Sequence, residues 1–231
     1  MAEPTYSAEK ECPVCQKKFN VTRTRGRQTL VKQDSDFCSH FQDINPYYYT
    51  VWVCSHCGYA AADGNFSELS VAAKDKIAKF LGNRTVNVNY SGIRTREQAI
   101  STYKLAIFFA ELIEASASKQ ADLYLRLSWL YREGENEHDE KAALAIACEQ
   151  YEQALFRERL PIGTLSETAV SYLIGELARR TEQTEKALLY LGKVVGNPAA
   201  KLEPRVLNLA REAWREAKVV RDREKAEAAA E

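Results

Sequence analysis

Four cysteines in two CxxC pairs are the residues of this chain whose type and spacing are best suited to chemistry. The first pair is Cys12 and Cys15, and the second is Cys54 and Cys57, followed directly by Gly58. A CxxC turn presents two thiolates to one side of a metal ion, so two such turns fill the four corners of a tetrahedral site. The pattern predicts one structural Zn²⁺, with no coordination position left for a substrate.

Other interpretations of the two pairs stay open at this point. The cysteines could be buried or form disulfides, and a redox-active CxxC is a third possibility, although no βαβ pattern surrounds either pair. Four thiolates also serve iron, so the sequence does not decide between zinc and iron. Gly58 suits the left-handed turn that follows such a pair, whereas Gln16 at the matching position costs about 1 kcal/mol.

The remaining thiols and imidazoles give weaker signals. Cys38, with His40 two residues on, is interpreted as a small apolar residue packed beside the metal site. Two alternatives are a redox-active thiol near the zinc and a direct share in metal binding. His56 is expected to be exposed, and His138 to be solvated. The chain has three histidines and no HExxH, GxSxG, P-loop or GxGxxG pattern, so neither an enzyme nor a small-molecule substrate is expected.

A run of basic side chains follows the first cysteine pair, with no acidic residue between Gln16 and Gln33. Such a run could contact phosphates of a nucleic acid. The preferred interpretation is that these cations balance the charge of a four-thiolate zinc site, about −2, and keep sheet edges soluble. The candidate phosphate contacts are Lys17, Lys18, Arg23, Arg25, Arg27 and Lys32.

The elements that must position the cysteines are short strands within residues 1–66. Residues 19–22 and 29–32 read as two strands of a hairpin, joined by the turn-prone residues 25–27. The aromatic run 47–53 reads as a third strand that leads directly into Cys54. A CxxC turn, a hairpin, a third strand and a second CxxC turn form the layout of a zinc ribbon. So small a sheet buries little apolar surface, and its metal would supply much of its stability.

Helical patterns take over after Phe66. Residues 67–95 are expected to hold one amphipathic helix, 67–81, and a polar linker, 85–94. Thr95 and Gln98 then have the form of a capping box, which marks the start of a helix. A helical domain over 96–222 follows, and the charged residues 223–231 are expected to fray. The predicted helices of this domain cover residues 96–117, 121–133, 141–158, 166–180, 184–195 and 204–222.

A small–large–small pattern recurs in these helices, with steps of four and three residues that place the three side chains on one face. Together with the preceding helices, it resembles the tetratricopeptide repeat, a helix pair of about 34 residues. The third copy keeps the internal spacing of the repeat, whereas the acidic loop 134–140 lengthens the second. The patterns are Ala99, Tyr103 and Ala106; Ala147, Tyr151 and Ala154; and Ala187, Leu191 and Val194.

Bulk composition excludes several classes of function. The chain has 231 residues with 32 basic and 32 acidic side chains, so nothing attracts the whole molecule to nucleic acid or an anionic membrane. Its apolar stretches are too short to cross a bilayer, and no membrane partner is expected. The first residues are polar and lack the apolar region of a secretory signal. We therefore expect a cytoplasmic protein.

Several motifs together resemble a bacterial family catalogued as domain of unknown function 2225. They are the residues 34–38, the Asn45–Tyr49 run and the segment 51–60 around the second cysteine pair, with Cys12 and Cys15 upstream. The resemblance implies a bacterial cytoplasmic protein with a zinc-ribbon-like head and a repeat tail, and almost nothing about function.

The expected fold class is therefore α+β: a small β zinc ribbon followed by an all-α, tetratricopeptide-like domain. The leading hypothesis for function is a non-catalytic adaptor that binds a protein partner through its helical groove or its ribbon face. The alternatives are a ribbon that binds nucleic acid through the basic residues of segment 17–32, and a redox sensor built on the zinc thiolates or Cys38.

Overall fold

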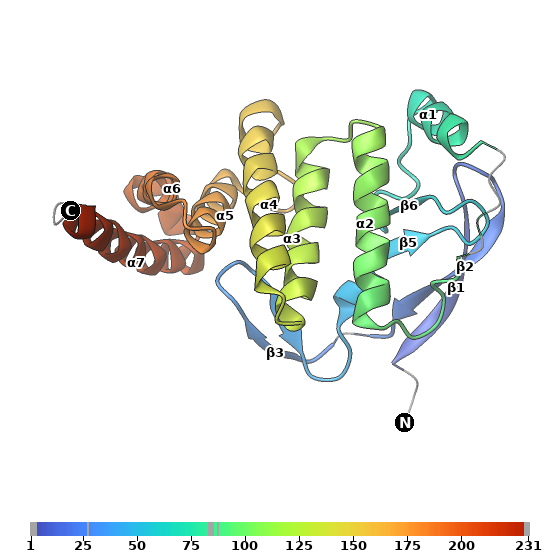
Figure 1. Ribbon diagram of the computed structural model, residues 1–231, viewed down its shortest axis with the longest axis horizontal. Helices are drawn as coiled ribbons and strands as arrows, with labels where there is room; N and C mark the ends of the chain where they lie inside the picture. The colour runs from blue at the N-terminus through green and yellow to red at the C-terminus, as the bar shows by residue number, and fades with distance from the viewer. Residues whose placement is uncertain (1–3, 27, 83–85, 87, 229–231) are drawn as a thin grey trace. The chain divides into compact units, whose positions relative to one another are not determined.

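The computed structural model describes residues 4–26, 28–82, 86 and 88–228, which fold into two compact units (Figure 1). The predicted boundary near Phe66 marks the change from strands to helices. It does not separate the compact units, because each unit contains segments from both sides of Phe66. The first unit holds Met1–Asp34, Cys38–Ala115 and Trp129–Glu137, and the second holds Ser35–Phe37, Ser116–Ser128 and His138–Glu231.

The strands form three two-stranded antiparallel sheets. The predicted hairpin of residues 19–22 with 29–32 is wrong, because each of these strands has a different partner. The segment Thr5–Glu11 has mostly exposed side chains, so it lacks the apolar alternation that announces a strand; its backbone nevertheless pairs along its whole length. The pairs are β1 (Thr5–Glu11) with β2 (Lys18–Thr24), β3 (Leu30–Gln33) with β4 (Ser39–Phe41), and β5 (Val51–Val53) with β6 (Ala60–Ala62).

The aromatic run before the second cysteine pair is only partly a strand. Pro46–Tyr49 forms the 3₁₀-helix η1, whose first turn is capped by the Asn45 side chain, an acceptor for the Tyr47 amide at 3.0 Å. Asparagine followed by proline is a helix-start signal, since proline fits the first helical position. The prediction of a strand over 47–53 is therefore correct for Val51–Val53 alone, and these three residues are all buried.

The helices follow the predicted bounds closely. The capping box of Thr95 and Gln98 is present, and the first helix begins at Val71, capped by Ser70, four residues later than predicted. The last helix continues to Ala228, so residues 223–228 are helical where a frayed end was expected. Seven α-helices lie in the described part of the chain: α1 (Val71–Leu81), α2 (Arg96–Leu112), α3 (Ala117–Glu133), α4 (Glu137–Arg157), α5 (Glu167–Arg180), α6 (Thr184–Gly196) and α7 (Pro204–Ala228), with a 3₁₀-helix η2 (Pro198–Leu202) before the last.

The core of the first unit lies where α2 packs on β5 and β6. The Tyr59 ring lies 5.0 Å from that of Phe66 and 5.4 Å from that of Phe109 on α2. Phe19 of β2 completes the aromatic cluster at 5.6 Å from Phe66. The small sheets thus obtain an apolar core from a helix that follows them in the chain.

Arg94, at the end of the predicted linker, ties that helix to the strands. The residue is 4% exposed, and its guanidinium donates to the carbonyl oxygens of Tyr48, Val51 and Tyr90, each at 2.8 Å. Burial lowers the pKa of Arg94 to about 10. A buried cation is stabilised only when its donors are matched in this way. Residues 83–85 and 87 of the linker region lie outside the described part of the chain.

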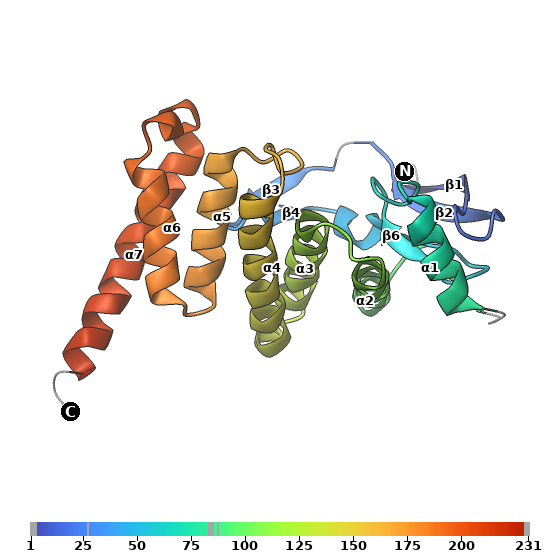
Figure 2. The same cartoon turned by 90° about the horizontal axis from the view of Figure 1, so that it is seen from above.

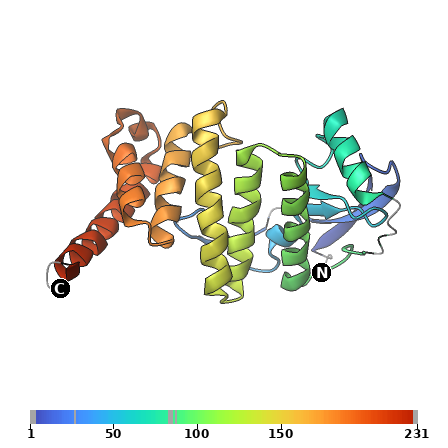
Figure 3. The ribbon, with the colours of Figure 1, turned by 45° about the horizontal axis from the view of Figure 1, so that its top comes forward.

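The second unit is built on an array of helices, α4 to α7, that lie side by side (Figures 2 and 3). The small–large–small residues of α4 and α6 are all buried, as the pattern predicts. Gly175 of α5 explains the closest approach: a Cβ built there would lie 2.7 Å from Cγ of Leu191 on α6. A glycine at this point lets the two helices pack closely, which no larger residue would allow without a shift.

Candidate metal centre and a thiol cavity

The four cysteines of the two CxxC pairs come together in the first unit, with all four sulfur atoms within 4.8 Å of one another. Sγ of Cys12 lies 3.6 Å from Sγ of Cys57, and Sγ of Cys15 lies 3.7 Å from Sγ of Cys54. Cys12 and Cys54 are fully buried, and the other two are half-buried. Four sulfur donors at these separations fit a tetrahedral ion such as zinc.

Two equivalent backbone turns position these sulfur atoms. In the first, the Gln16 amide donates to the Cys12 carbonyl at 2.9 Å, and in the second the Gly58 amide donates to the Cys54 carbonyl at 2.8 Å. Gln16 and Gly58 both adopt the left-handed conformation, with φ of 60° and 79°. The predicted strain at Gln16 is therefore present, since a non-glycine residue costs about 1 kcal/mol there.

Close contact between the sulfur atoms shifts the pKa values of Cys12, Cys54 and Cys57 in opposite directions. Hydrogen bonds with Cys12 and Cys57 lower the pKa of Cys54 to about 2, whereas a hydrogen bond with Cys54 raises the pKa of Cys12 to about 12. The pKa of Cys57 is also raised, first by its hydrogen bond with Cys12. Cys54 thus ionises more readily than Cys12 and Cys57, which hold their protons. A dication bound by Cys12, Cys15, Cys54 and Cys57 would fix the fold of the turns and release those protons.

The strands that carry Lys18, Arg23 and Lys32 of the basic run belong to two sheets, β1–β2 and β3–β4. Lys18 pairs with Glu9 at 2.8 Å and Lys32 with Asp34 at 3.3 Å. The guanidinium of Arg23 lies 5.6 Å from the centre of the Trp52 ring. Arg25 lies 5.5 Å from that of Tyr6, Lys17 is exposed, and Arg27 lies outside the described residues. Among the described residues, β2 and β3 do not pair, so the hairpin that could have presented these cations to phosphates is not formed.

Two of the histidines behave as expected from the sequence. His56 is exposed, with Nε2 at 2.9 Å from the Lys18 carbonyl oxygen, so the second CxxC turn presents its ring to solvent. The His138 side chain is 93% exposed beside Asp139. Neither imidazole belongs to the four-sulfur group.

Cys38 belongs to a second cluster, of which the sequence indicated only the nearby His40. Its Sγ, a ring nitrogen of His40 and a carboxylate oxygen of Asp34 lie within 4.8 Å of one another. The β3–β4 turn creates this proximity, because the Asp34 amide donates to the Cys38 carbonyl at 2.8 Å. The two cysteine clusters are thus distinct groups within the first unit.

A cavity of about 260 Å³ opens on this second cluster. The Cys38 residue is 4% exposed and contributes to the wall. Aromatic rings form one side, with Tyr47 4.8 Å from Trp129 and 5.9 Å from Phe41. The full lining is Lys32, Asp34, Cys38, Ser39, His40, Phe41, Asn45, Tyr47, Trp129, Arg132 and Glu133.

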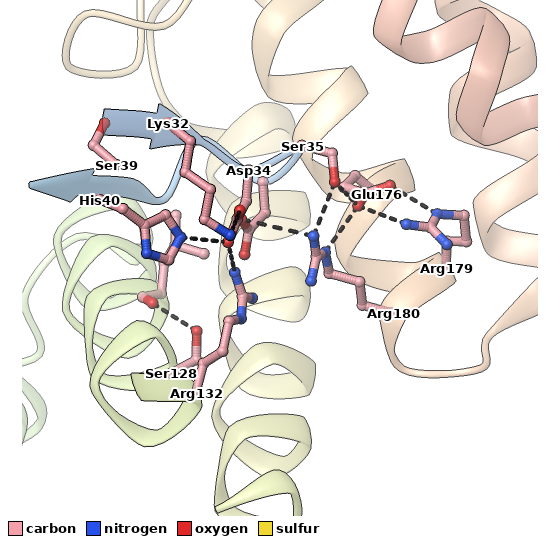
Figure 4. A network of polar contacts seen from close by, with 12 residues as sticks. Lys32, Asp34, Ser35, Ser39, His40, Ser128, Arg132, Glu176, Arg179 and Arg180 are labelled. Atoms are coloured by element: carbon pink, nitrogen blue, oxygen red, sulfur yellow. Dashed lines mark hydrogen bonds and ion pairs between the residues drawn. The ribbon is translucent and has the colours of Figure 1, made fainter. Parts of the chain in front are cut away.

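Asp34 is the electrostatic centre of the cavity wall (Figure 4). Its Oδ2 lies 2.8 Å from Nε2 of His40 and 3.0 Å from the Arg132 guanidinium, and its Oδ1 lies 3.3 Å from Nζ of Lys32. Burial opposes ionisation, but the hydrogen bond from His40 and the two cations outweigh it and lower the pKa of Asp34 to about 2. The carboxylate is therefore charged at neutral pH and fixes the orientation of the imidazole.

A polar network that the sequence did not reveal lies in the second unit, also shown in Figure 4. Glu176 of α5 is fully buried and accepts hydrogen bonds from Arg179, Arg180 and the Ser35 hydroxyl. The Tyr172 hydroxyl donates to the Ser35 carbonyl at 2.7 Å. The short segment Ser35–Phe37 is thus held against α5. An acidic residue in a helix pattern gives no sign of burial, so this network could not be anticipated.

The fold is that of an α+β protein whose strand-rich part carries a four-cysteine group that could hold a metal ion, with helices after it. The chain belongs to the family described as an uncharacterized protein conserved in bacteria, DUF2225, whose model matches residues 5–217. Comparison with curated proteins and with solved structures gives no significant match. Among the described residues, no helix is both long and apolar enough to cross a bilayer.

Proposed function

We propose that this protein is a non-catalytic, zinc-stabilised adaptor of the cytoplasm that binds another protein through its helical unit. The array of α4 to α7, with its close contact at Gly175 and Leu191, is the observation that carries the proposal. Stacked helix pairs of the tetratricopeptide type build extended surfaces that bind peptides or partner helices. We place the chain in that structural class as part of the proposal.

The role of the metal in this proposal is structural. Four protein sulfur atoms occupy the four corners of a tetrahedral ion, so no position remains at which water or a substrate could be activated. A thiol-rich site of this kind suits a reducing compartment. Zinc is the proposed ion, and its function is to hold β1–β2 and β5–β6 around the two turns.

The partner surface is proposed on the outer sides of α4 and α6. The face of α5 that carries Tyr172 and Glu176 already holds the chain's own segment Ser35–Phe37. By contrast, Phe156 of α4 is 72% exposed and Leu189 of α6 is 56% exposed. Exposed large apolar side chains on neighbouring helices favour a protein partner over a nucleic acid.

Co-purification from a bacterial lysate tests this proposal. The wild-type protein is compared with the double variant Phe156→Ser, Leu189→Ser and with a matched control, Val71→Ser, whose side chain on α1 is 76% exposed. We expect a protein that is retained in comparable molar amount by the wild type and the control and is lost from the double variant. If all three retain the same proteins, the proposed surface is wrong.

The nucleic-acid alternative receives less support from the structure. Its cations belong to two separate sheets, and two of them, Lys18 and Lys32, pair with carboxylates. Retention on DNA or RNA at low salt, lost when Lys17 and Arg23 become Ala, would reverse this ranking.

A further inference from the structure

The cavity beside Cys38 lies outside the proposed adaptor surface and the four-sulfur centre, and it brings a thiol and an imidazole together with a carboxylate that orients the imidazole. The orienting contact is the short one: Nε2 of His40 lies 2.8 Å from Oδ2 of Asp34. The nucleophile, Sγ of Cys38, is within 4.8 Å of both partners. Such distances are often looser without substrate and shorten when it binds.

The charges around this cluster favour a thiolate over a metal ion. A dication held by Asp34, Cys38 and His40 would face two cations that already bind the same carboxylate, Lys32 at 3.3 Å and Arg132 at 3.0 Å. An anionic sulfur, by contrast, is stabilised by nearby cations, and this is the environment in which reactive cysteines are found. The charged and titratable groups that line the cavity together with Cys38 are Lys32 of β3, Asp34 of the turn, His40 of β4, Tyr47 of η1, and Arg132 and Glu133 of α3.

Room for a reagent is present as well. The cavity of about 260 Å³ is many times the volume of one water molecule and approaches the lower limit of pockets that hold small organic ligands. The aromatic side formed by Tyr47 and Trp129 can cover an apolar body. Cys148, the other cysteine outside the four-sulfur site, has no such surroundings: it is fully buried in α4, and burial raises its pKa to about 12.

We propose that Cys38 is a nucleophilic thiol, activated by His40 and oriented through Asp34, that forms covalent adducts with small carbon electrophiles entering this cavity. The His40 imidazole, which has a ring nitrogen within 4.8 Å of Sγ, takes the thiol proton and becomes an imidazolium that Asp34 holds through Nε2. The thiolate then attacks the electrophilic carbon and forms a carbon–sulfur bond. The bond from that carbon to its leaving group breaks with its electron pair, and His40 later returns the proton to solvent.

Alkylation of the whole zinc-loaded protein by iodoacetamide tests the proposal, because sulfur displaces iodide and leaves a mass label on each peptide. We expect Cys38 to react at least about tenfold faster than Cys148, with half-maximal rate at a pH below about 8.5, the ordinary pKa of a thiol. This measurement needs no substitution, so it does not depend on whether a variant folds. A Cys38 rate equal to that of Cys148 overturns the proposal.

Variants then distinguish activation of the Cys38 thiol by His40 from simple access of iodoacetamide to that thiol. His40→Gln should slow the labelling of Cys38 by about tenfold or more and remove the low-pH part of its rate profile. Asp34→Asn should shift that profile, whereas His138→Gln and Asp139→Asn, matched changes in a histidine–aspartate pair that does not line the cavity, should leave it unchanged. An unaltered profile in His40→Gln contradicts the assigned base. Retention of a second zinc ion that protects Cys38 and is lost in His40→Gln would show a metal site instead, and would also overturn the proposal.

Discussion

At the scale of single residues, the chemistry of this protein depends on where its six cysteines fall. Four of them converge from two CxxC turns, one lies in a cavity with His40 and Asp34, and one, Cys148, is fully buried in α4. The same side chain is thus a candidate metal ligand, a candidate nucleophile and a core residue in one chain. Surroundings decide between these roles, because the thiolate forms only where cations, hydrogen bonds or a metal favour it.

Asp34 provides the sharpest residue-scale prediction. Its pKa of about 2 lies below the ordinary value near 3.9 expected in the unfolded chain. A lowered folded-state pKa stabilises the protein above the unfolded pKa, and this contribution disappears as the pH falls through the folded pKa. Asp34→Asn should therefore lower the free energy of unfolding by about 2 kcal/mol at pH 7, and the deficit should be roughly halved near pH 3.

Urea unfolding of wild type and Asp34→Asn at several pH values measures this difference. Glu182→Gln is the control, because that side chain is 79% exposed and its pairing with Lys141 contributes little in solvent. A deficit for Asp34→Asn that is the same at pH 7 and pH 3 would show that Asp34 acts through packing rather than through its charge.

At the scale of elements, periodic patterns predicted the helices well because burial of one face repeats every three or four residues. Capping residues such as Thr95 also placed several helix starts. The strands were harder to predict from the sequence. β1 has mostly exposed side chains and β3 is short and exposed, so their pairing depends on backbone hydrogen bonds that leave no mark in the sequence. Proximity of Asp34 to Cys38 comes from that unpredicted β3–β4 turn, which is why the cavity was missed while the four-sulfur site was found.

The contact between α5 and α6 yields an element-scale prediction. Gly175→Ala places a methyl group 2.7 Å from Cγ and 3.0 Å from the backbone nitrogen of Leu191, and the helices must move apart. Overpacking of this kind lowers the free energy of unfolding by about 1–3 kcal/mol. Gly196→Ala, with nothing within 4 Å of the new methyl group, should be neutral or stabilising by up to about 1 kcal/mol. Thermal unfolding followed by circular dichroism compares them; equal midpoints would contradict the close packing.

The contact of Arg94 with the segment before the second cysteine pair yields another element-scale prediction. Arg94→Met would leave the carbonyls of Tyr48, Val51 and Tyr90 without the donor that they share. Buried acceptors that lose a charged donor destabilise a fold by about 3 kcal/mol. Chemical unfolding followed by tryptophan fluorescence should show this loss for Arg94→Met, while the exposed Arg211→Met stays within about 0.5 kcal/mol of wild type. Similar values for the two variants would mean that Arg94 does not anchor α2.

At the scale of the whole molecule, the two compact units do not coincide with the two halves of the sequence. The first unit combines the strands with α1, α2 and the end of α3, and the second takes in the segment Ser35–Phe37 from the strand-rich half. The composition of the sequence changes once, near Phe66. This change reveals where strands give way to helices, but not that each compact unit contains segments from both halves of the sequence. The metal site, the thiol cavity and the Arg94 anchor all belong to the first unit, which concentrates the chemistry there.

The central claim is that zinc holds the first unit together through Cys12, Cys15, Cys54 and Cys57. Elemental analysis of protein purified without added metal tests it most directly, with Cys12→Ser and Cys57→Ser as variants and Cys148→Ala as the matched control. We predict about one zinc per chain in the wild type and the control, and none in either ligand variant. Metal-free wild type that remains fully folded, or zinc that survives both serine substitutions, would contradict the account.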